Sequence, residues 1–340
     1  MRFAFTDDQL LFRDTVGELF AKECPPEAVR WSWNDTNGRN PELWATLAEM
    51  GVTGLTVPES HGGMGMNEVD LLPILTEAGR YAFPGPIVET IAVAAPLLAE
   101  SAPAAIAERW LPGIADGSVI ATVALTGQPF VTDAHIADVL LAQRDDRIFA
   151  VPAENLRLTP QTSVDGARRL FVAEWDEADA ELIASGDEGL RCADRAFNRG
   201  AAATAAVLIG LSEQMIATTV AYVGERKQFG VPIGSFQAVK HHLADAELKV
   251  SFARPTVWNA AYSIAHNVPD VDRDVSMAKC FASDAAEVAS RKALQCHGAI
   301  GYTTEHDLHF WLKRSWALAA AWGDAAWHRR RVAHLLLDQV

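Results

Sequence analysis

Apolar residues recur every three or four positions over most of this chain, a spacing that predicts amphipathic helices. The first helix is expected after Thr6, because Thr6 and Gln9 have the spacing of a capping box and Cys24-Pro-Pro26 would stop the helix. A second helix is expected from Pro41 to Gly51, and others at about 67–82, with a kink at Pro73, 85–99 and 103–111. The expected buried residues of the first two helices are Leu10, Leu11, Val16, Leu19, Phe20, Leu43, Trp44, Leu47 and Met50.

From Ser118 the pattern changes to short apolar or β-branched runs separated by Gly, Pro, Asp and Asn, which predicts β-strands. These runs occupy residues 119–125, 139–143, 147–151 and 169–175. The helical spacing then returns at about 192–224, 235–266 with a kink at Pro255, 272–297, 304–313 and 324–338. The sequence therefore predicts a mainly α protein with a small central β domain. Its expected parts are an N-terminal helical domain (1–116), a central β domain (117–188) and a C-terminal helical bundle (189–340).

Composition and charge limit the classes of molecule that the protein can bind. The chain has 340 residues, 49% of them hydrophobic, which is enough for a large core. Its formal net charge of −15 argues against nucleic acid or an anionic membrane as a partner, because both require a cationic face. The four cysteines show no CxxC spacing, and the acidic N-terminus does not resemble a signal peptide. The sequence thus predicts a soluble, cytoplasmic protein with reduced thiols.

The most informative motif is Arg226-Lys-Gln-Phe-Gly-Val-Pro-Ile233, followed by Ser-Phe-Gln237 and, later in the chain, by Gln295-Cys-His-Gly-Ala-Ile-Gly-Tyr302. A guanidinium group, an aromatic ring, two amides and a glycine-rich helix exit can hold the pyrophosphate and adenine of a dinucleotide without a P-loop. The alternative is that Arg226 is a solvated cation at a helix end and Gly298 a simple helix cap.

This order of elements and motifs resembles the acyl-CoA dehydrogenase family. The resemblance covers nearly the whole chain and includes Gly54-Leu-Thr-Val-Pro-Glu59 and Gly62-Gly-Met-Gly65. It implies FAD as the cofactor and an acyl-CoA as the substrate. In that family the matching Arg and Gln reach across a dimer interface to the FAD of the neighbouring subunit. The FAD-binding residues implied for this chain are Arg226, Phe229, Gln237, Gln295, His297, Gly298 and Ala299, although His297 could instead simply pack.

The same resemblance reveals that a catalytic residue is missing. Family members need a carboxylate that removes the proton α to the thioester carbonyl. They carry it either in a Tyr-Glu-Gly-Thr segment before the last helix or early in the long helix ahead of the Arg motif. Here Trp322 occupies the first position and Gly200 the second, and neither side chain can accept a proton. Ala201 stands where an Arg usually helps to hold the CoA adenine, although Arg199 is adjacent.

The central domain also departs from the family. The loop that is Thr-Glu-Pro-x-x-Gly-Ser-Asp in the family is Leu125-Thr-Gly-Gln-Pro-Phe-Val-Thr-Asp133 here, and a later Trp-Ile-Thr-Asn segment has no match. The half-site for the chain's own flavin is therefore eroded, while the half that serves a neighbour is intact. The resemblance then implies a catalytic acyl-CoA dehydrogenase partner in an α2β2 hetero-oligomer, as in the paired actinobacterial enzymes that trim steroid side chains.

Two other functions stay open. The first is a self-sufficient homo-oligomeric dehydrogenase with a relocated base, Asp324 or Glu305, although Asp324 fits the N-cap of the last helix better. The second is a flavin-free scaffold or acyl-CoA-binding protein that descends from the enzyme. His306 and His309 share a helix face, but without a third ligand at a familiar spacing no metal site is predicted.

Overall fold

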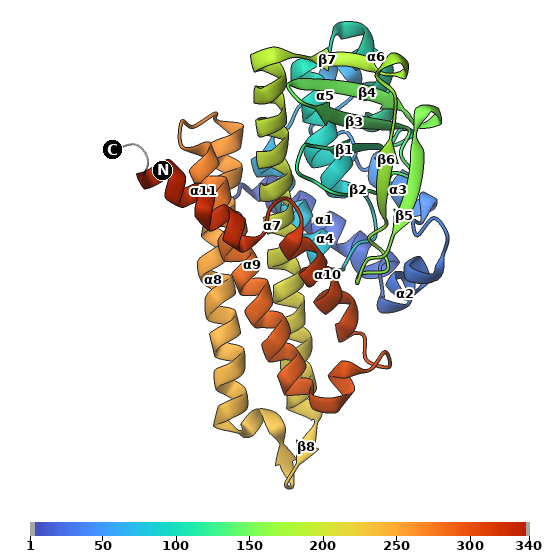
Figure 1. Cartoon of the computed structure of the whole chain (residues 1–340). Coiled ribbons are helices and arrows are strands. Elements are labelled where there is room, and N and C mark those ends of the chain that lie inside the picture. The colour runs from blue at the N-terminus through green and yellow to red at the C-terminus, as the bar shows by residue number, and fades with distance from the viewer. Residues whose placement is uncertain (1–3, 338–340) are drawn as a thin grey trace. The chain divides into compact units, whose positions relative to one another are not determined.

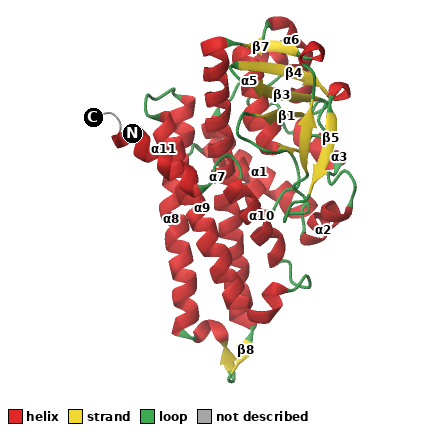
Figure 2. Ribbon diagram, viewed as in Figure 1, coloured by secondary structure: helices red, strands yellow, loops and turns green. Residues whose placement is uncertain are grey.

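The structure is a computed structural model that describes residues 4–337, and it confirms the mainly α fold with a small β part (Figures 1 and 2). A π-helical segment, Ile87–Ala94, replaces the first part of the helix expected at 85–99. The α-helices are α1 (Asp7–Glu23), α2 (Pro26–Asn34), α3 (Pro41–Glu49), α4 (Glu68–Arg80), α5 (Ala95–Ser101), α6 (Ala104–Ala115), α7 (Gly186–Glu225), α8 (Gln237–Ala265), α9 (Val271–His297), α10 (Leu308–Ala320) and α11 (Ala325–Leu337). The strands are β1 (Ala121–Ala124), β2 (Val131–Thr132), β3 (Val139–Arg144), β4 (Arg147–Pro152), β5 (Arg157–Gln161), β6 (Leu170–Glu174), β7 (Glu181–Ala184), β8 (Lys227–Gln228) and β9 (Val231–Pro232).

The chain separates into two compact units. The first draws on the segments up to Arg30, Leu72–Phe83 and from Thr204 onward, and the second on Trp31–Leu71 and Pro84–Ala203. The long helix α7 contributes residues to both units. The division into domains 1–116, 117–188 and 189–340 stays a prediction.

The predicted starts of two helices are confirmed by their caps. The Thr6 hydroxyl accepts a hydrogen bond from the Gln9 backbone N–H at 3.2 Å, and the Gln9 side chain accepts one from the Thr6 N–H at 2.8 Å. The Asn40 side chain accepts from the first N–H groups of α3, ahead of Pro41. The prediction that Leu11 is buried was wrong, because this residue of α1 is 67% exposed.

Helix α2 was not predicted. The Cys24-Pro-Pro26 sequence does end α1, as expected, but Pro26 is also the first residue of the next helix. Proline fits this position because the N–H it lacks would have no partner in the first helical turn. The same residue therefore acts as a stop for one helix and a start for another.

Small side chains allow the helices of the first unit to approach one another closely. Helices α8, α10 and α11 all pack against α9, as Figure 1 shows. Where α4 meets α7, a Cβ atom on Gly210 would lie 1.9 Å from the Thr76 carbonyl oxygen, and one on Gly79 would lie 2.1 Å from the Val207 carbonyl oxygen. Only glycine fits these two positions, since any side chain would collide with backbone. Buried small and β-branched residues on the α8 and α9 faces include Ala246, Val250, Ala253, Ala278, Ala282, Ala285 and Ala289.

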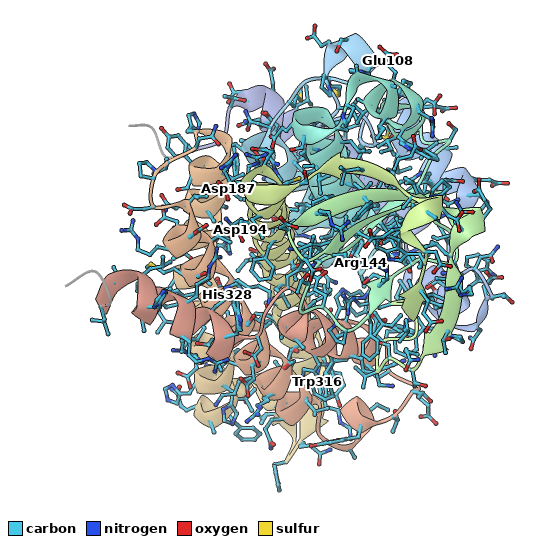
Figure 3. All side chains as sticks on the ribbon, turned by 45° about the horizontal axis from the view of Figure 1, so that its top comes forward. Glu108, Arg144, Asp187, Asp194, Trp316 and His328 are labelled. Atoms are coloured by element: carbon cyan, nitrogen blue, oxygen red, sulfur yellow. The ribbon has the colours of Figure 1, made fainter. Side chains whose placement is uncertain are left out.

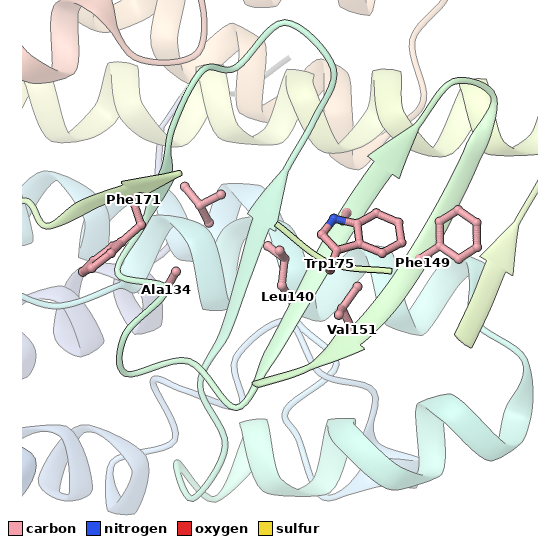
Figure 4. Packing of buried hydrophobic residues seen from close by; sticks show 8 residues of the cluster. Ala134, Leu140, Phe149, Val151, Phe171 and Trp175 are labelled. Carbon is pink, nitrogen blue, oxygen red and sulfur yellow. The ribbon is translucent and has the colours of Figure 1, made fainter. Parts of the chain in front are cut away.

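The second unit contains two small sheets. One has the strand order β1-β3-β4-β7, in which β1 and β3 are parallel and the other pairs antiparallel, and the other has the order β2-β6-β5. The strand runs predicted from the sequence correspond to β1, β3, β4 and β6, while β2, β5 and β7 were missed. A buried cluster that includes Leu140, Val151, Phe171 and Trp175 forms the core of this part (Figure 4).

Among residues 4–337, α7 is the one helix long and apolar enough to cross a membrane by length and composition. In its most apolar window 61% of the residues are buried inside the protein. The apolar side chains of α7 thus contribute to the protein core.

Candidate functional site

The Arg226 motif forms an exposed hairpin at the end of α7, in the first unit (Figure 1). Strands β8 and β9 pair antiparallel and leave Phe229 and Gly230 as a two-residue turn, with φ angles of 53° and 81°. Positive φ at both residues suits a tight hairpin but costs a non-glycine residue about 1 kcal/mol. The Phe229 side chain is 94% exposed. The hairpin thus holds a strained aromatic residue largely in solvent, although its ring meets that of Phe236 edge to face with 6.2 Å between the centroids.

Arg226 lies at the base of this hairpin, which we call the arm (residues 226–236). The Ile233 N–H donates to the Arg226 carbonyl oxygen at 2.8 Å and closes the arm. The Arg226 side chain is exposed and has no ion-pair or hydrogen-bond partner among residues 4–337. Gln237, the first residue of α8, is also exposed. Both side chains are therefore available to a ligand outside the chain.

The second motif ends α9. Gly298 follows the last helical residue with φ 64° and ψ −140°, a conformation that is essentially restricted to glycine. No atom lies within 4 Å of the position that a Cβ atom would take at Gly298, so the backbone there is open. Gln295 and Ala299 are exposed beside it. Gly298 caps α9, and the same geometry would allow a phosphate to approach its backbone.

His297 links the two motifs but is not exposed. Its ring is buried and stacks on Tyr222 of α7 with 4.4 Å between the ring centroids, and the Tyr222 hydroxyl donates to the His297 carbonyl oxygen at 3.4 Å. The His297 Nδ1 atom lies 2.8 Å from the Ala293 carbonyl oxygen. Burial lowers the pKa of His297, the bond to Ala293 opposes this, and His306 lowers the pKa further. His297 therefore packs within the protein and holds the ends of α7 and α9 together.

The segment between α10 and α11, where the resemblance predicts the family's glutamate position, holds a buried indole. Trp322 has φ 55° and Gly323 has φ 83°. The buried Lys279 ammonium group donates to the Ala319 and Gly323 carbonyl oxygens at 3.0 Å each. The His328 Nε2 atom lies 2.8 Å from the Trp322 carbonyl oxygen. Sequence analysis missed Lys279 and His328, which fix this segment, because neither residue belongs to a recognisable motif.

Asp324 is the N-cap of α11, as the sequence predicted, because its Oδ1 atom accepts a hydrogen bond from the Trp327 N–H at 2.7 Å. We expect Asp324→Ala to lower the free energy of unfolding by about 1 kcal/mol, and Asp324→Asn to change it little because asparagine caps equally well. Urea unfolding of the two variants measures this difference. Equal losses for both would show that the charge, and not the cap, is what matters.

The second family position for the base offers no carboxylate either. Gly200 is buried in α7. The neighbouring Arg199 guanidinium is buried as well and binds Glu68 at 2.6 Å and Glu100 at 2.9 Å. Burial acts to lower the pKa of Arg199, but the two glutamates outweigh it and the pKa lies above its usual value. Because Arg199 is held by two carboxylates, it does not replace the arginine that Ala201 lacks.

The remaining candidates lie in the turn that precedes α10 and in the first turn of this helix. Glu305 is exposed, and its backbone N–H donates to the Thr303 hydroxyl at 3.3 Å. The His306 Nδ1 atom accepts from the Leu308 N–H at 3.1 Å, and the His309 Nδ1 atom lies 2.9 Å from the His306 carbonyl oxygen. These contacts shape the turn that leads into α10.

In the second unit, the loop 125–133, which the resemblance identifies as an eroded flavin loop, folds onto its neighbouring strands. The Asp133 N–H donates to the Arg169 carbonyl oxygen at 2.8 Å, and the Thr122 hydroxyl donates to the Thr132 carbonyl oxygen at 2.6 Å. The Thr132 hydroxyl itself accepts from Arg168 at 3.1 Å. Of the two threonines of this loop, Thr132 is thus engaged within the protein, whereas Thr126 is exposed. The exposed Arg226 and Phe229 and the open backbone at Gly298 offer a cation, an aromatic ring and free space, which are the groups that the ADP half of FAD requires.

Comparison with known proteins identifies the family. Residues 6–118 match the profile "Acyl-CoA dehydrogenase, N-terminal domain" and residues 187–337 match "Acyl-CoA dehydrogenase, C-terminal domain". Acyl-CoA dehydrogenase IpdE2 of Mycolicibacterium smegmatis is 32% identical over 328 residues, which cover 96% of this chain and 98% of that protein. Among solved structures, the ChsE4-ChsE5 complex from Mycobacterium tuberculosis has a TM-score of 0.87 at 25% identity, over 99% of each chain. The Tcur3481-Tcur3483 steroid ACAD has a TM-score of 0.89 at 23% identity, over 98% of each chain. As its motifs predicted, the chain belongs to the acyl-CoA dehydrogenase family of FAD-dependent oxidoreductases.

Proposed function

We propose that this chain is an acyl-CoA dehydrogenase subunit that supplies the ADP-side half of a shared FAD site, while a partner subunit supplies the catalytic glutamate. One contrast carries the proposal. The arm presents Arg226 and Phe229 to solvent, yet the segment that should hold the base carries the buried Trp322. An indole N–H is only a donor and cannot accept a proton.

The chain's own residues would bind and orient the cofactor. Arg226 would form paired hydrogen bonds to pyrophosphate oxygens, which its planar guanidinium suits better than an ammonium group. Phe229 would pack on the cofactor, and the open backbone at Gly298 would approach the phosphates. Gln237 and Gln295 would add amide donors. When bound, FAD supplies the hydride acceptor for the β-carbon of the substrate.

Unlike-subunit assembly and a bulky acyl-CoA substrate are further parts of the proposal. The ChsE4-ChsE5 complex and the Tcur3481-Tcur3483 steroid ACAD, whose names each join two proteins, support a pair of unlike chains. The second of these names also supports a steroid-derived acyl group as the substrate class. We propose an α2β2 assembly in the cytoplasm that removes hydrogen across the α,β bond of such a CoA ester.

The test compares the chain expressed alone with the chain co-expressed with a relative that retains the flavin loop and the glutamate. FAD per protein chain is measured by absorbance, and acyl-CoA oxidation by a dye-coupled assay. We expect little flavin and no turnover from the single chain, and one FAD per pair of chains in the active complex. A yellow, active protein from the single gene would favour a relocated base, and flavin-free complexes would favour the scaffold function; either result rejects the proposal.

A further inference from the structure

A lysine and a histidine meet near the helix ends that carry the two glutamines of the proposed half-site. Helix α8 begins at Gln237 and α9 ends at His297, and the two helices lie side by side and antiparallel (Figure 1). Between them, the Lys292 Nζ atom lies 2.9 Å from the His242 Nδ1 atom. Lys292 precedes Gln295 by three residues, so the two side chains share a face of α9, about 4.5 Å apart along the helix axis.

The charge of Lys292 is only weakly compensated within the chain. An ammonium group can only donate, and the His242 ring accepts its hydrogen bond without contributing negative charge. The one ion pair of Lys292 among residues 4–337 is with Asp245, at 3.8 Å, and the Asp245 side chain is 64% exposed. Water and salt screen a long ion pair with an exposed carboxylate. The Lys292 side chain is itself 29% exposed, so its charge remains available to an anion outside the chain.

The proposed cofactor carries more negative charge than Arg226 alone can balance. The pyrophosphate of FAD has two negative charges, and Arg226 supplies one positive charge. Lys227 and Lys240 are exposed, but neither side chain has a hydrogen bond or an ion pair among residues 4–337, so binding would have to immobilise a freely moving lysine. Lys292 is already restricted by His242 and would lose less freedom on binding.

We propose that Lys292 is the second cation of the cofactor half-site and binds a phosphate oxygen of FAD, while His242 is a positioning residue that holds the Lys292 side chain beside Gln295. The inference rests on the proposed function, because it concerns the same ADP-side half of the cofactor. The ammonium group acts as a point charge, which complements the paired hydrogen bonds of the Arg226 guanidinium. The helices α8 and α9 then contribute charge to the half-site as well as amide donors.

Lys292→Met tests the charge in the complex co-expressed with a partner that retains the flavin loop and the glutamate. Methionine keeps an unbranched apolar stem that can pack like that of lysine, but it has no charge. We expect FAD to bind about tenfold more weakly, as measured by the dissociation constant from fluorescence titration. The affinity should also fall less steeply as salt is added than in the wild type, because one screened attraction has been removed. A purely structural defect would lower the affinity without changing its salt dependence.

Arg291 provides the matched control. It is the neighbouring cation of α9, but its guanidinium group pairs with Glu287 at 2.6 Å and lines a pocket between α9, α10 and α11, beside Trp316 (Figure 3). Arg291→Met removes the same charge from another face of the same helix and should leave FAD affinity and its salt dependence unchanged. Equal effects of the Lys292 and Arg291 variants would show that only the net charge of α9 matters and would reject the inference.

Two variants of His242 test its positioning role. Glutamine can still accept a hydrogen bond from Lys292, whereas leucine cannot. We expect nearly wild-type FAD affinity for His242→Gln and a loss of about threefold for His242→Leu, because the freed lysine must be ordered on binding. Equal affinities of these two variants would reject the positioning role.

The outcome for Arg226→Ala separates this inference from the proposed function. Unchanged FAD affinity in Lys292→Met, together with weakened binding in Arg226→Ala, would reject Lys292 as a cofactor ligand and leave the proposed function standing. A complex that binds no FAD in any form would reject the proposed function and this inference with it.

Discussion

An assembled complex that carries Arg226→Ala should bind FAD about a hundredfold more weakly than the wild-type complex. The exposed guanidinium has no partner among residues 4–337, so its removal leaves the fold of this chain unchanged. In the proposed site it forms two charge-assisted hydrogen bonds to the pyrophosphate, each worth about 1.5 kcal/mol or more, and their sum gives the expected loss. Flavin retained after gel filtration and the dissociation constant from fluorescence titration measure the effect.

A lysine variant separates the effect of the guanidinium geometry from that of its charge, and a second variant serves as a control. Arg226→Lys keeps the charge but cannot form the paired bonds, so we expect a loss of about tenfold, intermediate between wild type and alanine. Arg157→Ala removes an exposed arginine of β5 in the second unit and should leave flavin binding unchanged. Unchanged FAD affinity in the Arg226→Ala complex would show that the arm does not hold the cofactor, whatever the activity of the complex.

The sequence predicts best those features that depend on a few neighbouring residues. The capping box at Thr6, the helix start at Pro41 and the Asp324 cap of α11 each require only residues within one helical turn, and all three are present. The arm could be located as a motif for the same reason. Its conformation could not, because Phe-Gly lacks the Asn-Gly or Asp-Gly signature of a tight hairpin and Phe229 adopts a positive φ.

Features that depend on contacts between distant parts of the chain could not be predicted from the sequence pattern. Lys279 and its acceptors at Ala319 and Gly323 are brought together only by the packing of α10 and α11 against α9. A lysine in a helix is ordinarily a surface residue, so its burial could not be predicted. Leu11 shows the converse, since an apolar residue at the expected spacing proves to be exposed.

Lys279 and His328 also bear on how the α10–α11 segment keeps its shape. The segment holds Trp322 at a positive φ, which costs a non-glycine residue about 1 kcal/mol. Hydrogen bonds from both buried side chains to its carbonyl groups offset that cost. The segment in turn positions Asp324, whose side chain caps α11.

Acidification should therefore weaken the first unit through His328. Burial lowers the pKa of His328 to about 4, the bond to Trp322 opposes this, and the charges of Lys279 and Arg331 add to the lowering. In the unfolded chain a histidine has a pKa near 6.5. The stabilising contribution of the neutral, buried His328 is therefore complete above about pH 6.5 and is lost as the pH falls towards 4, because the unfolded chain binds the proton more readily. The difference between the two pKa values corresponds to a loss of about 3 kcal/mol.

Urea unfolding at about pH 7 and about pH 4.5 in wild type and His328→Gln measures this contribution. Glutamine can still donate to the Trp322 carbonyl oxygen but does not titrate, so the stability of the variant should depend less on pH. The exposed His241 provides the control, because His241→Gln should keep the wild-type dependence. Other buried histidines and carboxylates titrate alike in all three proteins and cancel from the comparison. Identical pH dependence in wild type and His328→Gln would mean that the buried ring does not control the segment that carries Trp322.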